Sequence, residues 1–141
     1  MTREEKQLLL KDICARLPYE NTEVKVTEPT NDIMGEVFVG RHICSTIDIE
    51  DFILGKFIIR PYLRPMSSMT NEEKKDILQS LNIYGDIDNE GNLLLGTECN
   101  IITLKTCKKY LGELNKRMFD VCHLIEKGLA LEAQEGMYET K

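Results

Sequence analysis

The fold class is decided by residues 23–59, which read EVKVTEPTNDIMGEVFVGRHICSTIDIEDFILGKFII. Val24 and Val26 alternate with polar residues, and Val37 and Val39 repeat this period of two, which is typical of half-buried strands. The alternation continues on one strand face through residues 43, 45, 47 and 49, and residues 57–59 form an unbroken apolar run, as in a strand buried on both faces. The segment predicts a small curled antiparallel sheet, and it leaves open whether the sheet closes into a partial barrel.

Helical signals flank this segment. Thr2 and Glu5 form a capping box, in which each side chain satisfies a backbone donor of the other residue. Apolar residues then follow at helical spacing until Pro18, which ends the predicted helix. Thr70 and Glu73 form a second capping box, which predicts a helix to about residue 81.

The C-terminal third is also predicted to be helical, from about Leu104. The inward face of this helix is expected to hold Leu111, Leu114, Met118, Val121 and Ile125. Asp120 is a candidate cap for a separate final helix, and Gly128 fits the left-handed position that closes one, with Leu129 returning to Leu124. The chain is predicted to form one α+β domain over residues 1–141, with N-terminal, middle and C-terminal helices packed on the sheet and an extended tail from about residue 133.

Two connections follow from turn chemistry. Residues 60–65, RPYLRP, are expected to leave the sheet, because proline cannot donate a hydrogen bond to a strand ladder. Residues 83–95 read as two short strands joined at Asn89-Glu90-Gly91, which predicts a hairpin.

Composition narrows the class of protein. The net charge is −6, whereas proteins that bind nucleic-acid duplexes are usually basic, so a duplex partner is not expected. No stretch is long and apolar enough to span a membrane, and no signal peptide is expected at the start of the chain. The five cysteines are odd in number and lack metal-ligand spacing. This pattern predicts free thiols in a reducing cytoplasm.

No cofactor, metal or catalytic residue is predicted. Residues 86–91 match the first part of an EF-hand loop, but the twelfth position is Thr97 rather than a bidentate carboxylate, which favours a hairpin turn. His42 and Cys44 would share a strand face, and a structural role is favoured for both. Asp48, Glu50 and Asp51 form an acidic cluster that could resemble the carboxylate pair of a glycosidase or phosphatase. The favoured interpretation is a solvated surface, with Asp48 and Glu50 on the polar face of a strand.

The candidate binding residues are basic or aromatic and lie on a locally positive segment, residues 56–75. They are Arg60, Tyr62, Arg64, Lys74 and Lys75. Arginine binds carboxylate or phosphate with a two-pronged fork, and tyrosine offers a stacking face. The alternative is a structural role, in which Tyr62 and Leu63 fix the crossing from sheet to helix and the arginines are solvated or cap nearby carbonyls.

Three segments carry a family resemblance: MTREEKQLLLKDICARLPY, IIRPYLRPMSSMTNEEKK and LIEKGLALEAQEGMY, at residues 1–19, 58–75 and 124–138. They resemble short uncharacterised proteins of gut Bacteroidota and their phages and prophages. Relatives more often have lysine where this chain has Arg60, and proline where it has Gln134. The resemblance implies an origin in a mobile element and supplies no activity.

These observations predict a non-enzymatic phage or mobile-element accessory protein that binds a host or phage macromolecule, most readily a protein, since the chain is acidic. One alternative is a small RNA-binding or single-strand-binding module that uses the basic band from Arg60 to Lys75. A second alternative is a small hydrolase or nuclease that uses scattered carboxylates. The oligomeric state is left open.

Overall fold

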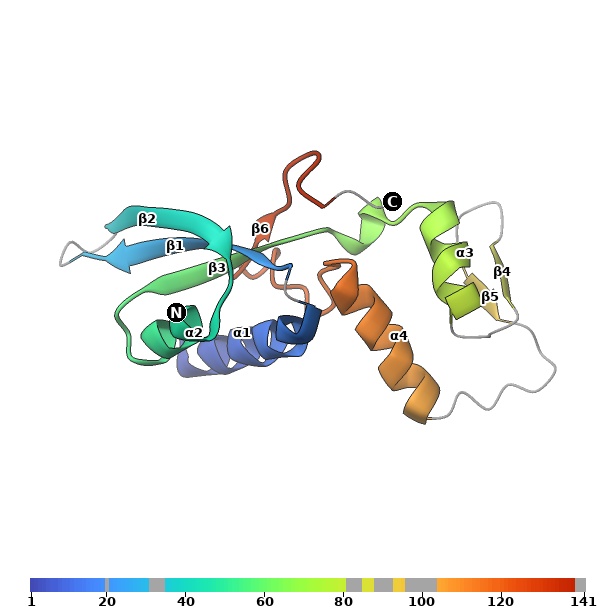
Figure 1. Cartoon of the computed structure of the whole chain (residues 1–141), viewed down its shortest axis with the longest axis horizontal. Helices are drawn as coiled ribbons and strands as arrows, with labels where there is room; N and C mark the ends of the chain where they lie inside the picture. The colour runs from blue at the N-terminus through green and yellow to red at the C-terminus, as the bar shows by residue number, and fades with distance from the viewer. Residues whose placement is uncertain (20, 31–34, 81–84, 88–92, 96–103, 139–141) are drawn as a thin grey trace.

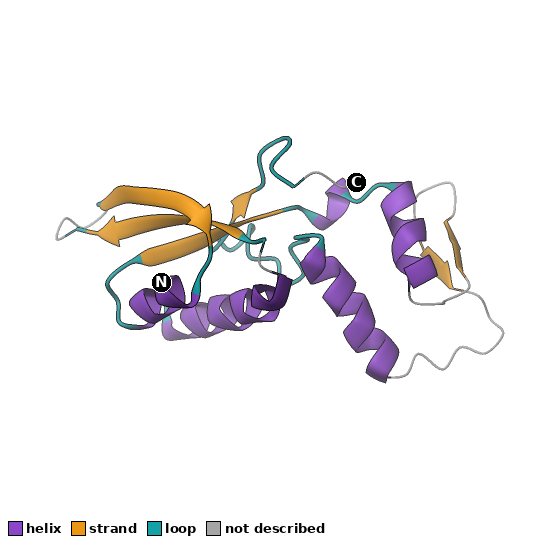
Figure 2. Cartoon of the chain, in the orientation of Figure 1, coloured by secondary structure: helices purple, strands orange, loops and turns teal. Residues whose placement is uncertain are grey.

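The computed structural model describes residues 1–19, 21–30, 35–80, 85–87, 93–95 and 104–138. It has the predicted α+β architecture, with helices packed against a four-stranded sheet (Figures 1 and 2). The strand order is β2-β1-β3-β6. These strands are β1 (Glu23–Pro29), β2 (Glu36–Ile43), β3 (Ile58–Leu63) and β6 (Leu131–Glu132). β1 is antiparallel to β2 and β3, whereas β6 is parallel to β3, so the sheet is mixed. It stays open and does not close into a barrel.

The structure describes four α-helices, two of which begin at predicted capping boxes. They are α1 (Arg3–Arg16), α2 (Thr46–Ile53), α3 (Asn71–Ser80) and α4 (Leu104–Lys116), with short 3₁₀ turns at Leu17–Tyr19 and Met66–Ser68. Both capping boxes are confirmed, at Thr2 with Glu5 and at Thr70 with Glu73. The predicted hairpin is also present, as β4 (Gly85–Ile87) paired antiparallel with β5 (Leu93–Leu95). Its connecting residues 88–92 lie outside the described residues.

Two hydrophobic clusters organise the packing. In the first, α1 and α2 bury apolar residues against the sheet and the segment after α4. Its fully buried members include Leu9, Ile13, Val24, Ile59, Leu63 and Leu124. The second joins α3 to α4 through Ile77, Leu114 and Phe119. Because a buried core residue loses its contact with water, these side chains supply most of the stabilisation of their helices.

The strand predicted at residues 45–49 is wrong, because these residues begin helix α2. Ser45 is the N-cap: its hydroxyl accepts from the Asp48 amide, and the Asp48 carboxylate accepts from the Ser45 amide at 2.8 Å. The buried residues of α2 are Ile49 and Phe52, which are three positions apart, while Ile47 is exposed. A capping box and helical spacing therefore outweigh the apparent alternation.

The prediction that residues 60–65 leave the sheet is also wrong, because β3 runs to Leu63. Pro61 pairs with Val24 of β1 at the end of that ladder, and the ladder with β6 begins one residue later, at Tyr62. The missing donor of Pro61 therefore falls at the junction of two ladders, where a proline is tolerated.

The predicted inward seam of α4 is only partly correct. Leu114 and Met118 are buried, but Leu111 is 45% exposed. The helix ends at Lys116, and Met118 has a left-handed backbone with φ 64°, so the positions after it do not keep the helical phase. This shift removes the regular 3-4 spacing that the sequence pattern implied.

The segment after α4 consists of turns rather than a final helix. Asp120 still caps backbone donors, since its carboxylate accepts from the amides of Leu124 at 2.8 Å and Ile125 at 3.0 Å. Gly128 adopts φ 73°, and the Leu129 amide donates to the Leu124 carbonyl, as the predicted closure requires. The capping chemistry is therefore present without the helix.

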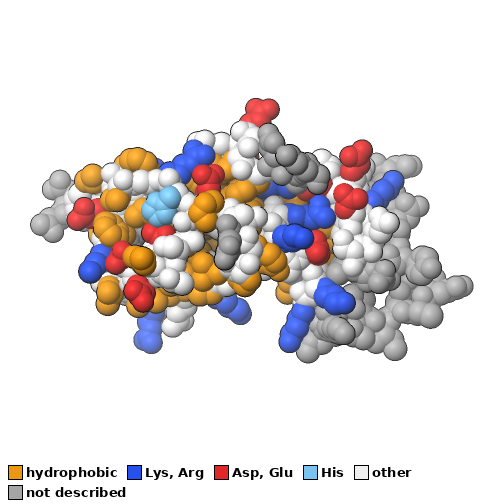
Figure 3. All heavy atoms as spheres, viewed as in Figure 1, with side chains coloured by type: hydrophobic (Ala, Val, Ile, Leu, Met, Phe, Trp, Pro, Cys, Tyr) orange, Lys and Arg blue, Asp and Glu red, His pale blue; other side chains and the backbone are white. Residues whose placement is uncertain are grey.

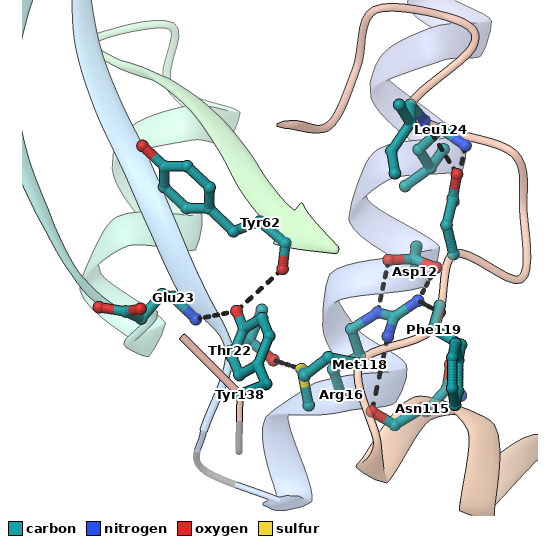
Figure 4. Close-up of polar contacts among 12 residues, drawn as sticks. Asp12, Arg16, Thr22, Glu23, Tyr62, Asn115, Met118, Phe119, Leu124 and Tyr138 are labelled. Carbon is teal, nitrogen blue, oxygen red and sulfur yellow. Dashed lines mark hydrogen bonds and ion pairs between the residues drawn. The ribbon is translucent and has the colours of Figure 1, made fainter. Parts of the chain in front are cut away.

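The C-terminal tail is folded back rather than extended. After β6 the chain turns at Gly136, and the Met137 amide donates to the Gln134 carbonyl. The Tyr138 hydroxyl then donates to the Tyr62 carbonyl at 2.8 Å and accepts from the Glu23 amide at 3.0 Å (Figure 4). One side chain thus ties the tail to both β1 and β3.

Candidate functional site

Of the predicted binding residues, Arg60 and Tyr62 lie on β3, Arg64 directly follows it, and two lysines lie on α3. Arg60 projects toward β2, where its guanidinium donates to both oxygens of Glu36 at 2.8 Å. This two-pronged hydrogen bond lowers the pKa of the Glu36 carboxyl from its ordinary value. Arg60 therefore holds the edge strand to the centre of the sheet.

Arg64 points instead toward α3. Its guanidinium donates to both oxygens of Glu73, at 2.8 and 2.7 Å, and lies 4.3 Å from the centre of the Phe119 ring. The backbone of Arg64 also accepts from the Asp120 amide and donates to the Met118 carbonyl. With 14% of its side chain exposed, Arg64 is part of the packing between β3, α3 and the end of α4. This geometry favours the structural alternative for Arg64.

The Arg64–Glu73 pair predicts an acid-sensitive contribution to stability. The hydrogen bond from Arg64 is the largest cause that lowers the pKa of Glu73. A carboxyl whose folded pKa is depressed stabilises the fold above its unfolded pKa, and that contribution is lost as the pH falls through the folded value. We expect Glu73→Gln to cost about 1–3 kcal/mol at neutral pH, and the difference from wild type to shrink below about pH 4. Urea unfolding across this pH range measures it, and a difference that stays constant with pH would contradict the assignment.

Tyr62 does not offer a free stacking face. Its side chain is buried, with 8% exposed, and the Arg41 guanidinium lies 5.2 Å from the ring centre. Its backbone carbonyl is occupied by Tyr138. Arg41 also bonds Glu23 and Gln134, so the ring is covered by a side chain with polar partners of its own.

Lys74 and Lys75 lie on α3, where Lys75 is exposed and Lys74 is half-buried and engaged in an interaction. The structure thus directs the two arginines of the predicted set to different elements. Arg60 is turned to β2, and Arg64 is turned to α3. That the five residues form one binding surface stays a prediction.

The nucleophile candidates are in structural positions. Burial raises the pKa of the Cys44 thiol to about 12, which removes the thiolate that nucleophilic attack requires. His42 is hydrogen-bonded to Asp48 at 2.8 Å and does not share a strand with it, since Asp48 lies on α2. Glu50, like Asp48, lies on α2 rather than on the predicted strand face.

Among the described residues, no group of three His, Cys, Asp or Glu side chains is arranged to hold a metal ion. Much of the loop considered for calcium, including residues 88–92 and 96–97, lies outside those residues. A search of the same residues for a helix long and apolar enough to cross a membrane finds none.

One pocket lies between the turn at residues 66–68 and the folded-back tail. It has a volume of about 220 Å³ and is lined by residues that include Arg64, Ser68, Glu132 and Glu135. Pockets for small molecules usually measure about 300–1,000 Å³, so this one is small for such a ligand.

A charged cluster that sequence reasoning missed is buried between α1 and α4. Arg16 has 0% exposure, and its guanidinium donates to both Asp12 oxygens, at 2.8 and 3.0 Å (Figure 4). It also donates to the Phe119 carbonyl at 2.7 Å and approaches the Asn115 carbonyl at 3.5 Å. Arg16 therefore caps the C-terminal end of α4, where unpaired carbonyls attract a cation. The spacing of Asp12 and Arg16, one helical turn apart, was the available signal.

A second missed feature is an apolar surface on β2 and α2, which we call the β2–α2 surface. It holds seven of the eleven large hydrophobic side chains that are exposed in the described part of the chain: Val37, Phe38, Val39, Ile43, Ile47, Ile53 and Leu54. Hydrophobic side chains are visible over this end of the molecule in Figure 3. Exposed apolar side chains that gather in one region of a soluble protein are typical of interaction sites. The three consecutive apolar residues at 37–39 were the signal in the sequence.

The hairpin of β1 and β2 extends beyond the rest of the sheet (Figure 1). β3 pairs with β1 only as far as Thr27, whereas the β1–β2 ladder continues to Pro29 and Glu36. The distal half is thus a two-stranded ribbon, and every residue of β2 except Gly40 is exposed. Because isolated two-stranded ribbons are only marginally stable, contact with a partner would stabilise this part most.

Comparisons with protein-family models, with curated proteins and with solved structures find no match to this chain.

Proposed function

We propose that this chain is a non-enzymatic accessory protein of a phage or mobile element, which binds a partner protein through the β2–α2 surface. The observation that carries the proposal is the concentration of exposed apolar side chains on one projecting strand and the helix that follows it. Burial of apolar area supplies most of the free energy of protein association. The family resemblance supports the mobile-element origin.

The two alternatives find less support in the geometry. A nucleic-acid module requires available cations and aromatic faces, but Arg60 and Arg64 are paired with carboxylates and Tyr62 is buried. A carboxylate-based hydrolase requires carboxylates that converge in a cleft. The buried carboxylates of Glu73 and Asp12 are each bound by an arginine.

The test is capture from a lysate of gut Bacteroidota cells, with captured proteins identified by mass spectrometry. We expect the triple variant Phe38→Asp, Ile47→Asp and Leu54→Asp to lose the partner that the wild type captures. The reason is that three charges on the surface oppose its desolvation. Its melting temperature is expected to stay close to that of the wild type, since all three side chains are at least 61% exposed.

Leu111→Asp is the matched control. Leu111 is also an exposed apolar residue, but it lies on α4 rather than on the β2–α2 surface. This variant is expected to capture the same partner as the wild type. Equal capture by the triple variant, or equal loss in the control, would contradict the proposal.

A further inference from the structure

We infer that the partner binds by strand addition: an extended segment with an apolar centre and Lys or Arg flanks pairs with the free edge of β2. The inference rests on the proposed function, because it describes how the β2–α2 surface would take its partner. Its elements are the backbone edge of β2, the side chains beside that edge, and the charge around them.

The backbone of β2 has one open side. β2 is the first strand in the order β2-β1-β3-β6, so β1 pairs with one of its edges and no described strand pairs with the other. The amides and carbonyls of an open edge are available for pairing with an extended peptide. In the distal ribbon β1 also lacks β3 as a neighbour, so an added strand would complete a three-stranded unit.

Three consecutive side chains beside this edge are apolar. Val37, Phe38 and Val39 are 48–61% exposed. Val37 and Phe38 pair regularly with Glu28 and Thr27, so their side chains point to opposite faces of the strand. The register shifts between Val26 and Thr27, which pair with Gly40 and Phe38, so that Val39 is the extra residue of a bulge. A bulge interrupts a long regular ladder, which favours a short added segment over indefinite stacking of copies.

The charge around β2 indicates which segment would fit. Residues 21–55 hold seven acidic and two basic side chains. Three of these acidic residues have partners, since Glu23 is bound by Arg41, Glu36 by Arg60 of β3, and Asp48 by His42. Glu28, Glu50 and Asp51 form no ion pair with another described residue. A second copy of this chain would bring a like-charged surface, while a basic-flanked segment would be attracted. Charge therefore favours a basic heterologous segment over self-association.

The experiment is selection from a displayed library of random linear peptides against the full chain. We expect enriched peptides to alternate apolar residues over about five positions, between flanking lysines or arginines. The most enriched peptide is then resynthesised with single backbone N-methyl groups. Methylation at every second amide, those that face β2, should weaken binding at least about tenfold, and methylation at the intervening amides should leave it nearly unchanged.

Two outcomes would overturn strand addition. One is the absence of enrichment, or enrichment of acidic or helix-patterned peptides. The other is a peptide whose binding is weakened by N-methylation at successive amides instead of at every second one. The triple variant separates this failure from that of the proposed function. If it still loses the lysate partner, the β2–α2 surface binds a protein by another geometry. If it captures the partner as well as the wild type does, the β2–α2 surface is not the binding site.

Discussion

Replacing Arg16 by alanine is expected to lower the free energy of unfolding by about 3–5 kcal/mol, as found when one partner of a buried ion pair is removed. Asp12 is buried, with 4% exposed, and the change removes the cation that its carboxylate binds. It also leaves the carbonyl of Phe119, in the segment just after α4, without its donor. Chemical denaturation followed by circular dichroism measures the loss.

The control is Arg3→Ala, because Arg3 is an exposed arginine on the same helix. It is expected to change stability by less than about 0.5 kcal/mol. The double variant Asp12→Leu with Arg16→Met is expected to recover part of the loss, since no buried charge is left unpaired. Equal stability of Arg16→Ala and Arg3→Ala would show that the buried pair does not hold α1 to α4.

Replacing Phe119 by alanine is expected to cost about 3–5 kcal/mol, the usual range for a large aromatic residue in a core. Phe119 is 0% exposed and joins Ile77 of α3 to Leu114 of α4. Its ring also lies under the guanidinium of Arg64, so the change removes a cation–π contact as well as apolar burial. Thermal unfolding, followed by the circular dichroism of the α-helices, measures the loss of stability.

Phe38→Ala provides the matched comparison, with the same substitution at a residue that is 61% exposed. It is expected to change stability by less than about 0.5 kcal/mol. Comparing the two alanine substitutions distinguishes a role in core packing from a role in partner binding, because Phe119 is assigned to the core and Phe38 to the binding surface. A stability loss at Phe38 as large as that at Phe119 would mean that the distal hairpin is buried in the folded chain.

Helix caps and tight turns were the features of the fold that could be predicted best from the sequence. The capping boxes at Thr2 and Thr70 depend on side chains three residues apart, and both formed. The left-handed Gly128 also followed from local chemistry. Alternation is a less reliable signal, because residues 43–49 fit a strand and a helix about equally and only the Ser45 cap distinguishes the two. The place of Pro61 depended on where β6 begins, which is set about seventy residues later in the chain.

The candidate site was harder to predict, because whether a charged side chain is free depends on distant residues. Arg60 forms an ion pair with Glu36 across the sheet, and Arg64 forms one with Glu73 on the next helix. Neither pairing is visible in the positive charge of residues 56–75. Exposure of Val37 and Phe38 likewise arises because β3 stops pairing at Thr27, which leaves the distal hairpin without a neighbour.

Binding of a partner at β2 and α2 would leave a signature in amide hydrogen exchange. The measurement compares this chain alone with the chain bound to the partner identified by capture. Half of the amides of an open edge strand lack a partner and exchange quickly when free. We predict that exchange slows in residues 36–43 on binding and stays unchanged in residues 64–75. Slowing confined to residues 64–75, with none in residues 36–43, would contradict the account.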